Sequence, residues 1–290
     1  MAGFPVTLVG VGNMGGGMAQ RLASLGWAPS VHDLDPAKVD ALVPFGTLAP
    51  VDIAQAASKS IATIVCVVDA AQTRDVLFGP EGLAHHLPAG HVVLLCPTIA
   101  PQDVESIAAL LGQQGVLTLD APLSGGPVRA REGSMSLMVA GPDAAWAACE
   151  TLLTALSSQV FRISDRVGDG ARTKLVNNLL AGINLVGAAE ALALADRLGL
   201  DAGRTLEVIA QSSGQSWIGS DRMRRAIAGD LAPRAHMTLL AKDTRLALDA
   251  AREAGFTGPL GGAASAVFAQ AVRAGLAGMD DASLLDFLKR

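Results

Sequence analysis

The stretch GARTKLVNNLLAGINLVGAAEALALAD, at residues 170–196, decides how the rest of the chain is organised. Leu175, Leu179, Ile183 and Val186 recur at steps of three and four residues, and alanine and leucine dominate its second half. This periodicity predicts one long helix. At 1.5 Å per residue the helix is roughly 40 Å long, which is more than one small domain needs. We therefore expect it to join two parts of the chain.

The start of this predicted helix carries polar side chains. Lys174, Asn177 and Asn178 are spaced by three and four residues, so they share one face of a helix. No other charge follows Lys174 until Glu190. Taken alone, Lys174 is most simply a surface lysine at a helix start, and the motifs elsewhere in the chain must decide whether it does more.

Near the N-terminus, the apolar run FPVTLVG is followed directly by the glycine pattern GVGNMG at residues 10–15. A strand, a glycine turn and a helix in this order can hold a pyrophosphate, because glycines let the backbone approach it and the helix N-terminus favours its charge. Asp33 lies 21 residues after Gly12, the spacing for a carboxylate on an adenosine ribose. A purely structural glycine turn is the alternative. The predicted cofactor-binding residues here are Gly10, Gly12, Asn13, Met14, Gly15 and Asp33.

Beyond this motif the chain alternates between continuous apolar runs and helical segments. The runs at 61–68, 91–96 and 116–119 are typical of parallel strands buried on both faces, and helices are expected at 71–77 and 101–111. We predict an α/β fold with a Rossmann-type doubly wound sheet over residues 1–164, whose ligand lies at the carboxyl ends of the strands. An all-helical domain for substrate binding and oligomerisation is expected over residues 165–290, with Asp280, Asp281 and Asp286 near the C-terminus as solvated charges and caps.

A short loop after the third of these runs offers hydrogen-bond donors. Ser124 is followed by Gly125 and Gly126, so a hydroxyl and exposed backbone N–H groups come together. Such a nest can hold a carboxylate. A plain glycine–proline turn between strands is the alternative.

The composition limits the possible functions. The net charge of −5 and the 3% aromatic content argue against a nucleic-acid partner. The three cysteines follow neither a disulfide nor a zinc spacing, and the five histidines form no ligand pattern, so we expect no metal. Wholly apolar runs are shorter than the ~18 residues of a membrane span. We therefore expect a cytoplasmic protein without a membrane partner.

Four segments, in this order, resemble the β-hydroxyacid dehydrogenase family, which includes 3-hydroxyisobutyrate dehydrogenase and tartronate semialdehyde reductase. They are GVGNMGGGMA, DAPLSGGPVRAREGSMSLMVAG, GARTKLVNN and KDTRLAL. The second and third are far more specific than a glycine pattern, and together the four span nearly the whole chain. The resemblance implies an oxidoreductase that uses NAD and a small hydroxy-acid substrate and that assembles as a homodimer or homotetramer.

The resemblance also implies roles for single residues. Lys174 matches the catalytic acid/base and Asn178 the amide that assists it. Ser124, Gly125 and Gly126 match the substrate-carboxylate segment. The remaining substrate-side candidates are Asn177, Trp217 and Asp243, and the remaining cofactor-side candidates are Val67, Val68, Thr98 and Lys242.

Several positions depart from the common family pattern. Val67 and Val68 stand where Leu-Pro is frequent, and Pro97 precedes Thr98 where Ser-Thr is common. The segments VVDAAQTRDVLFG, SSGQSW and MDDAS favour the L-threonate dehydrogenase branch. The pair Asn177-Asn178, by contrast, is what hydroxyisobutyrate dehydrogenases show.

The reaction we expect is reversible hydride transfer between the alcohol carbon of a hydroxy acid and nicotinamide. Lys174 would take the hydroxyl proton during oxidation, and burial lowers the pKa of a lysine in the direction this needs. NAD is favoured over NADP because Leu34 and Asp35, and no arginine, follow Asp33. A tartronate semialdehyde or related aldehyde-acid reductase is the nearest alternative. An imine reductase or a non-catalytic NAD-binding module is disfavoured by the intact set of Lys174, Asn178 and Ser124.

Overall fold

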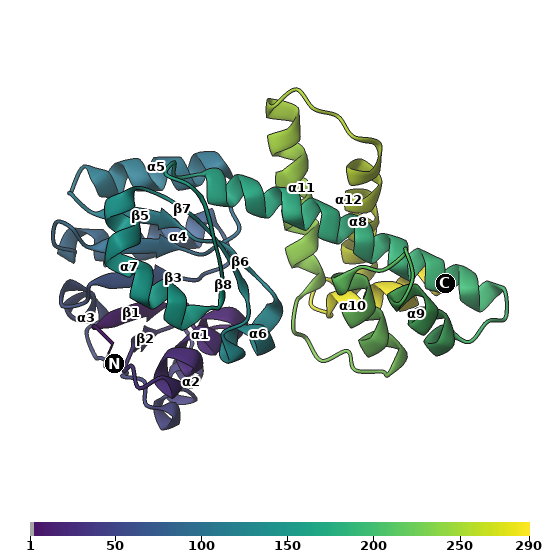
Figure 1. Ribbon diagram of the computed structural model, residues 1–290, viewed down its shortest axis with the longest axis horizontal. Coiled ribbons are helices and arrows are strands. Elements are labelled where there is room, and N and C mark those ends of the chain that lie inside the picture. The colour runs from purple at the N-terminus through teal and green to yellow at the C-terminus, as the bar shows by residue number, and fades with distance from the viewer. Residues whose placement is uncertain (1–2) are drawn as a thin grey trace. The chain divides into compact units, whose positions relative to one another are not determined.

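The computed structural model describes residues 3–290, and its contacts divide the chain into two units, Met1–Lys174 and Leu175–Arg290. The first unit is built on one sheet, and the second is helical (Figure 1).

The sheet of the first unit has eight strands within the described residues, in the order β2-β1-β3-β4-β5-β7-β6, with β8 paired to β7. Strands β1 to β5 run parallel, as the continuous apolar runs predict. The chain passes from β1 to β2 on one side and to β3 on the other, so the order reverses at β1. The strands are β1 (Val6–Val9), β2 (Ser30–His32), β3 (Ala62–Val65), β4 (Val92–Leu95), β5 (Leu117–Asp120), β6 (Leu123–Ser124), β7 (Ser136–Ala140) and β8 (Gln159–Ser164).

Helices cover both faces of this sheet (Figure 1). One core cluster joins side chains of α1 and α7 to one face, and another joins those of α3, α4 and α5 to the other. Burial on both faces explains why the strand residues are apolar without alternation. The helices are α1 (Asn13–Ser24), α2 (Pro36–Asp40), α3 (Ile53–Ser58), α4 (Ala70–Phe78), α5 (Pro101–Gly112), α6 (Gly126–Glu132) and α7 (Asp143–Leu156).

The three cysteines are free thiols in this unit. Cys96 and Cys149 are buried among the core residues, and Cys66 packs against the same cluster. Burial raises the pKa of the Cys149 thiol to about 12. They are therefore apolar core residues, as their sequence context indicates.

The long helix predicted at 170–196 is α8 (Asp169–Arg197), and it contains the point at which the two units meet along the chain. The helical unit continues through α9 (Ala202–Ala210), α10 (Trp217–Ile227), α11 (Met237–Glu253), α12 (Pro259–Ala271) and α13 (Leu284–Lys289), with short turns η3 (Val272–Leu276) and η4 (Asp281–Ser283). Its core gathers around Phe268, Met223 and Met237.

Among the described residues, α8 is the one helix long and apolar enough to cross a membrane, with a mean hydropathy of 1.5 in its most apolar window. Leu185, Ala189 and Leu192 of this helix are buried in the core of the helical unit. Length and composition alone pass this test, so α8 is weak evidence for a membrane span.

Candidate active site

The glycine turn after β1 has the geometry that close backbone contact requires. Gly10 has a φ of +88°, a conformation that favours glycine, and a Cβ on Gly15 would lie 1.9 Å from the Gly10 carbonyl oxygen. A Cβ on Gly12 would meet nothing within 4 Å, so the space above it is open. No side chain caps α1, whose N-cap is Gly12. An open helix N-terminus behind a glycine turn fits a pyrophosphate.

Asp33 follows β2 and is tied to this turn. Its Oδ2 accepts a hydrogen bond from the Val11 N–H at 2.9 Å, and its Oδ1 accepts from the Asp35 N–H at 3.0 Å. The Lys38 ammonium lies 3.1 Å from Oδ1. Burial works to raise the pKa of Asp33, but these hydrogen bonds and the Lys38 charge bring it below its ordinary value. The Asp33 carboxylate is thus ionised beside the glycine turn, where it could accept a hydrogen bond from a ribose hydroxyl.

The other cofactor-side candidates of this unit lie at the same edge of the sheet. Val67 and Val68 come directly after β3, and Thr98 comes shortly after β4. Because β1, β3 and β4 are parallel neighbours, these residues and the glycine turn all follow carboxyl ends at one edge. The structure therefore brings together the cofactor candidates that precede Lys174.

The Ser124 loop follows β5 at this edge as well. Ser124 is the last residue of β6, pairs with Ser136 of β7 and is half-buried. Gly125 and Gly126 have φ values of +128° and +78°, which disfavour any residue with a side chain. They lead straight into α6, so the predicted glycine–proline turn is also a helix start.

Asp120, the last residue of β5, binds the start of α8. Its Oδ2 accepts hydrogen bonds from the Gly168 N–H at 3.0 Å and the Ala171 N–H at 2.8 Å. Burial raises the pKa of this carboxyl group to about 7, although the N–H donors of Ala171, Gly168 and Gly170 act in the opposite direction. The sequence pattern did not single this residue out, since its partners lie about fifty residues away.

Lys174 and Asn178 are one turn apart on α8, and both are buried, at 6% and 7% exposure. The simple interpretation of Lys174 as a surface lysine is therefore wrong. Asn178 donates from Nδ2 to Oδ2 of Asp243 at 2.6 Å, and its Oδ1 accepts from Asn177 at 3.0 Å. Asp243 lies on α11, and its Oδ1 is 3.0 Å from the Lys242 Nζ. The structure thus links four predicted site residues, Asn177, Asn178, Asp243 and Lys242.

The C-terminal acids are a correction to the sequence prediction. Asp280 and Asp281 were expected to be solvated, but both are buried, at 0% and 1% exposure. Arg225 Nη1 lies 3.1 Å from Asp280, and Arg222 Nε lies 2.6 Å from Asp281. Arg222 and Arg225 are three residues apart and share one face of α10. The two ion pairs therefore join this face to the start of η4. Asp280 does act as a cap, accepting from the Ala282 N–H.

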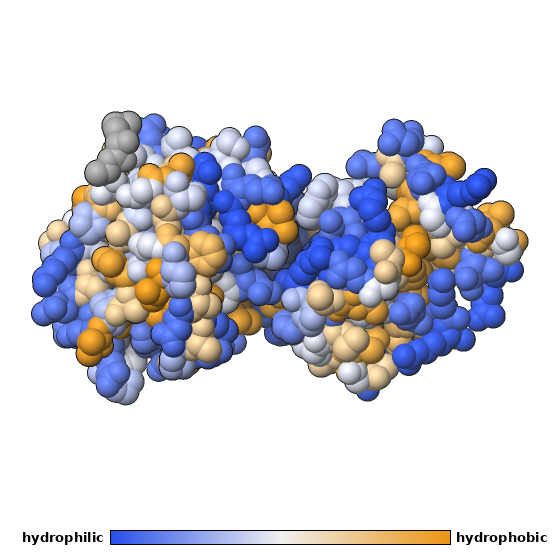
Figure 2. Space-filling view, turned by 90° about the horizontal axis from the view of Figure 1, so that it is seen from below, coloured by the Kyte–Doolittle hydropathy of each residue, from blue (hydrophilic) through white to orange (hydrophobic). Residues whose placement is uncertain are grey.

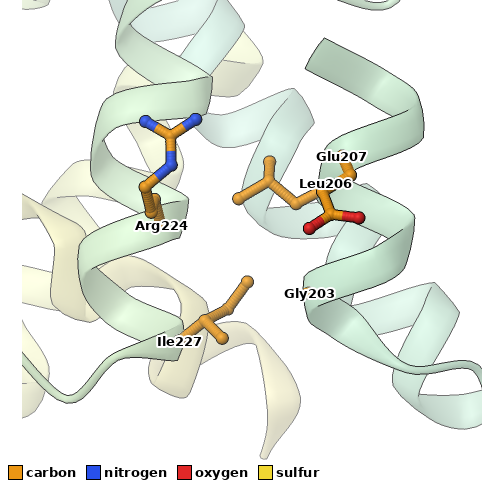
Figure 3. Close-up of a pocket in the computed structure, with 5 residues that line it drawn as sticks. All are labelled: Gly203, Leu206, Glu207, Arg224 and Ile227. Atoms are coloured by element: carbon orange, nitrogen blue, oxygen red, sulfur yellow. The ribbon is translucent and has the colours of Figure 1, made fainter. Parts of the chain in front are cut away.

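Trp217 begins α10 and is 45% exposed. A pocket of about 240 Å³ lies in the helical unit between α9 and α10 (Figure 3), and it contains none of the predicted site residues. Leu206 points into it, with the charged ends of Glu207 and Arg224 at its rim. Within residues 3–290, no group of three or more His, Cys, Asp or Glu side chains is placed to hold a metal ion.

Comparison with known proteins gives a consistent result over both units. Residues 5–164 match the family model described as the NAD binding domain of 6-phosphogluconate dehydrogenase. Residues 168–288 match the model described as NAD-binding of NADP-dependent 3-hydroxyisobutyrate dehydrogenase. A nicotinamide cofactor thus agrees with the glycine turn and Asp33.

Individual relatives cover nearly the full chain. An L-threonate dehydrogenase from Cupriavidus necator is 36% identical over 97% of this chain and 94% of its own length. A 3-hydroxyisobutyrate dehydrogenase from Pseudomonas aeruginosa is 36% identical over 73% of this chain and 71% of its own. The crystal structure of a 3-hydroxyisobutyrate dehydrogenase from Salmonella typhimurium superposes with a TM-score of 0.92 at 36% identity, covering 98% of this chain and all of that one. Imine reductases, such as one from Pseudomonas sp. at 23% identity and a TM-score of 0.67, share the fold alone.

Proposed function

The chain belongs to the β-hydroxyacid dehydrogenase family, and from this premise we propose that it transfers a hydride reversibly between NAD and L-threonate, with Lys174 as the general acid/base. The observation that carries the proposal is the buried lysine on α8, one turn before an amide fixed by a carboxylate. Burial favours the neutral form of a lysine, which is the form that a proton acceptor must take.

The cofactor side of the proposal rests on the first unit. The Gly10–Gly15 turn and the α1 N-terminus would hold the pyrophosphate, and Asp33 would accept from the ribose hydroxyls. The ionised Asp33 would repel a 2′-phosphate, which supports NAD over NADP. Bound nicotinamide supplies the hydride acceptor or donor. Val67, Val68 and Thr98 would line its side of the site, and Lys242 is a further proposed cofactor contact.

The substrate side uses fixed donors and acceptors. Lys174 would take the proton of the substrate hydroxyl in oxidation and return it in reduction. Asn178 would hydrogen-bond that hydroxyl or orient Lys174, since Asp243 and Asn177 already fix its amide. Ser124, with the N–H groups at Gly125 and Gly126, would hold the carboxylate and so choose the face of the reacting carbon. Asn177, Asp243 and Trp217 complete the proposed substrate contacts.

L-threonate as the substrate is supported by the relatives named L-threonate dehydrogenase, which match over 97% of this chain. 3-Hydroxyisobutyrate is the second candidate, because the Asn177-Asn178 pair follows that branch and a protein of that name is equally identical over a shorter stretch. A tartronate semialdehyde reductase remains the alternative with an aldehyde-acid substrate.

Initial rates of NADH formation test the substrate. We expect L-threonate to exceed 3-hydroxyisobutyrate, D-glycerate, L-serine and D-threonine in kcat/KM, and NAD to exceed NADP with the same substrate. A higher kcat/KM for 3-hydroxyisobutyrate would move the chain to the second candidate. No oxidation of any hydroxy acid, with NADH binding intact, would favour a non-catalytic NAD-binding protein.

Replacing Lys174 tests the mechanism. Lys174→Ala should bind NADH normally but turn over at least ~10²-fold more slowly, the usual scale of a lost acid/base. Lys174→Arg should be equally slow, because arginine keeps the charge but does not release its proton. Near-normal turnover in either variant would remove Lys174 from the mechanism.

A homo-oligomer in the cytoplasm completes the proposal. Large apolar side chains on the helical unit are more than half exposed, and Figure 2 shows apolar patches among polar residues on the face in view. Burial between subunits would remove such side chains from water. They are Val176, Leu180, Leu194, Leu198, Leu200, Val208, Phe256 and Leu260. A monomeric mass by light scattering at micromolar concentration would refute the oligomer.

A further inference from the structure

Asp120 lies in the sheet next to the proposed site and is not among the proposed catalytic, substrate or cofactor contacts. It ends β5, a central strand of the sheet, where it pairs with Leu95 of β4 and Ala140 of β7. Its side chain is 1% exposed. Four residues later the chain reaches Ser124, the proposed carboxylate ligand. A movement at Asp120 would therefore be transmitted directly to the start of the Ser124 loop.

The carboxylate of Asp120 caps α8 from a distant part of the sequence. The first N–H groups of any helix lack partners within the helix, and a side-chain oxygen near the N-terminus usually satisfies one or two of them. Here Oδ2 of Asp120 accepts from both Gly168 and Ala171, at 3.0 and 2.8 Å. These two bonds satisfy donors that have no partner within the helix. The cap thus connects the sheet to the first turn of the helix.

Gly170 shows how closely the helix and the strands approach each other. A Cβ at this position would lie 2.7 Å from the Asp120 carbonyl oxygen, 2.8 Å from that of Met138 and 2.9 Å from the Asp120 Cγ. Two of these three contacts are with strand backbone, which cannot turn away as a flexible side chain can. Glycine is therefore required if the first turn of α8 is to sit where the Asp120 carboxylate can reach it.

We propose that Asp120 is a positioning residue for catalysis, which fixes the first turn of α8 against β5 and thereby sets where Lys174 lies relative to the Ser124 loop. Lys174 follows Ala171 by three residues, less than one turn of helix. The same side chain therefore anchors the helix that carries the acid/base and the strand that leads to the carboxylate ligand. This inference rests on the proposed role of Lys174.

Two substitutions with different chemistry test it. Asp120→Ala removes the cap, while Gly170→Ala keeps the carboxylate but forces the helix start away from the strands. Gly187→Ala is the matched control, because it lies on the same helix and its Cβ would meet nothing within 4 Å. Each variant is titrated with NADH by fluorescence, so that kcat is expressed per cofactor-binding site and a loss of folded protein does not count as a loss of catalysis.

We expect Asp120→Ala and Gly170→Ala to lower kcat per site by about 10- to 100-fold, since a misplacement of about 1 Å at a reacting group costs this much. Gly187→Ala should match the parent protein. Asp120→Asn, which keeps an acceptor oxygen in nearly the same shape, should recover most of the activity lost in Asp120→Ala. Should Asp120→Ala not fold, Gly170→Ala carries the test alone, and an unchanged kcat per site in that variant then overturns the proposal.

Unchanged kcat per site in both Asp120→Ala and Gly170→Ala, with only the number of NADH sites or the melting temperature reduced, would overturn the proposal and leave Asp120 a purely structural cap. This failure is distinct from failure of the proposed function, which shows itself in the Lys174→Ala variant whatever Asp120 does.

Discussion

Removal of the Asp243 side chain is expected to slow catalysis without emptying the cofactor site. Asp243 is 7% exposed, and its Oδ2 accepts the Asn178 Nδ2 donor at 2.6 Å. A hydrogen bond to a charged group contributes about 1.5–3 kcal/mol to stability. If Asn178 acts in the transition state through this bond, Asp243→Ala should lower kcat by about 10- to 150-fold, at 1.36 kcal/mol per factor of ten.

Asp243→Asn provides a graded version of the same test. The asparagine oxygen can still accept from Asn178, but a neutral bond is about half as strong as a charge-assisted one. Its kcat should therefore fall between those of Asp243→Ala and the parent protein. Asp249→Ala is the control, because Asp249 lies on the same helix and forms ion pairs with two exposed arginines, Arg245 and Arg252.

The assay is steady-state NADH formation, again expressed per NADH-binding site. Asn178→Ala and the double variant Asn178→Ala/Asp243→Ala complete a cycle, and we expect the double variant to be little slower than the slower single one. A kcat for Asp243→Ala within twofold of the parent, or effects of the two substitutions that simply multiply, would refute the idea that Asp243 acts through Asn178.

Three further predictions concern the cofactor, the fold and the pH. Lys38→Ala should lower kcat/KM with NADP more than with NAD, because Lys38 lies beside Asp33 at the position a 2′-phosphate would approach; an equal loss with both cofactors would contradict this. Arg222→Ala should lower the free energy of unfolding by about 3–5 kcal/mol, because it leaves the buried Asp281 without its partner. Arg166→Ala should lower it far less, because the Arg166 side chain is exposed. Urea denaturation at pH 7.5 measures both, and similar losses would refute the distinction. His91 is buried against Thr63 and the Ser60 carbonyl, and burial lowers its pKa from 6.5 to about 4. The folded state thus binds fewer protons than the unfolded state between about pH 4 and pH 6.5, so stability should fall as the pH drops through this window, by roughly 2–3 kcal/mol near its lower end. In His91→Gln this part of the loss of stability at low pH should disappear. In the exposed control His86→Gln it should remain as in the parent protein.

The sequence predicts the fold well where a single segment carries its own signal. The parallel strands β3, β4 and β5 are apolar throughout because helices cover both faces of the sheet, and the long helix α8 has an unbroken period. Boundaries were less predictable. The helix expected at 71–77 extends over Ala70–Phe78, because the Asp69 side chain accepts from the Gln72 N–H and caps it one residue earlier.

The residues of the candidate site also fall into two groups, those that a local motif reveals and those that only the folded chain reveals. The glycine turn, Asp33, Ser124 and Lys174 could be found from local motifs, because each motif carries its own chemistry. Asp120 and the Arg222–Asp281 pair could not, since their partners lie about fifty or sixty residues away in sequence and only the folded chain joins them. Periodicity reports which face of a helix is apolar, and it does not report which charges will meet across two elements.

All three cysteines lie in the sheet-containing unit, and the helical unit contains none. Alkylation of the native cysteines therefore reports on unfolding of the sheet-containing unit, and no cysteine has to be introduced. A short pulse of an alkylating reagent in mild denaturant, followed by mass spectrometry, would count opening events of the nucleotide-binding half through Cys149, while circular dichroism follows the chain as a whole. Coincident curves would mean that the two halves unfold together; protection of Cys149 by added NAD would measure the binding energy directly on the half that receives it.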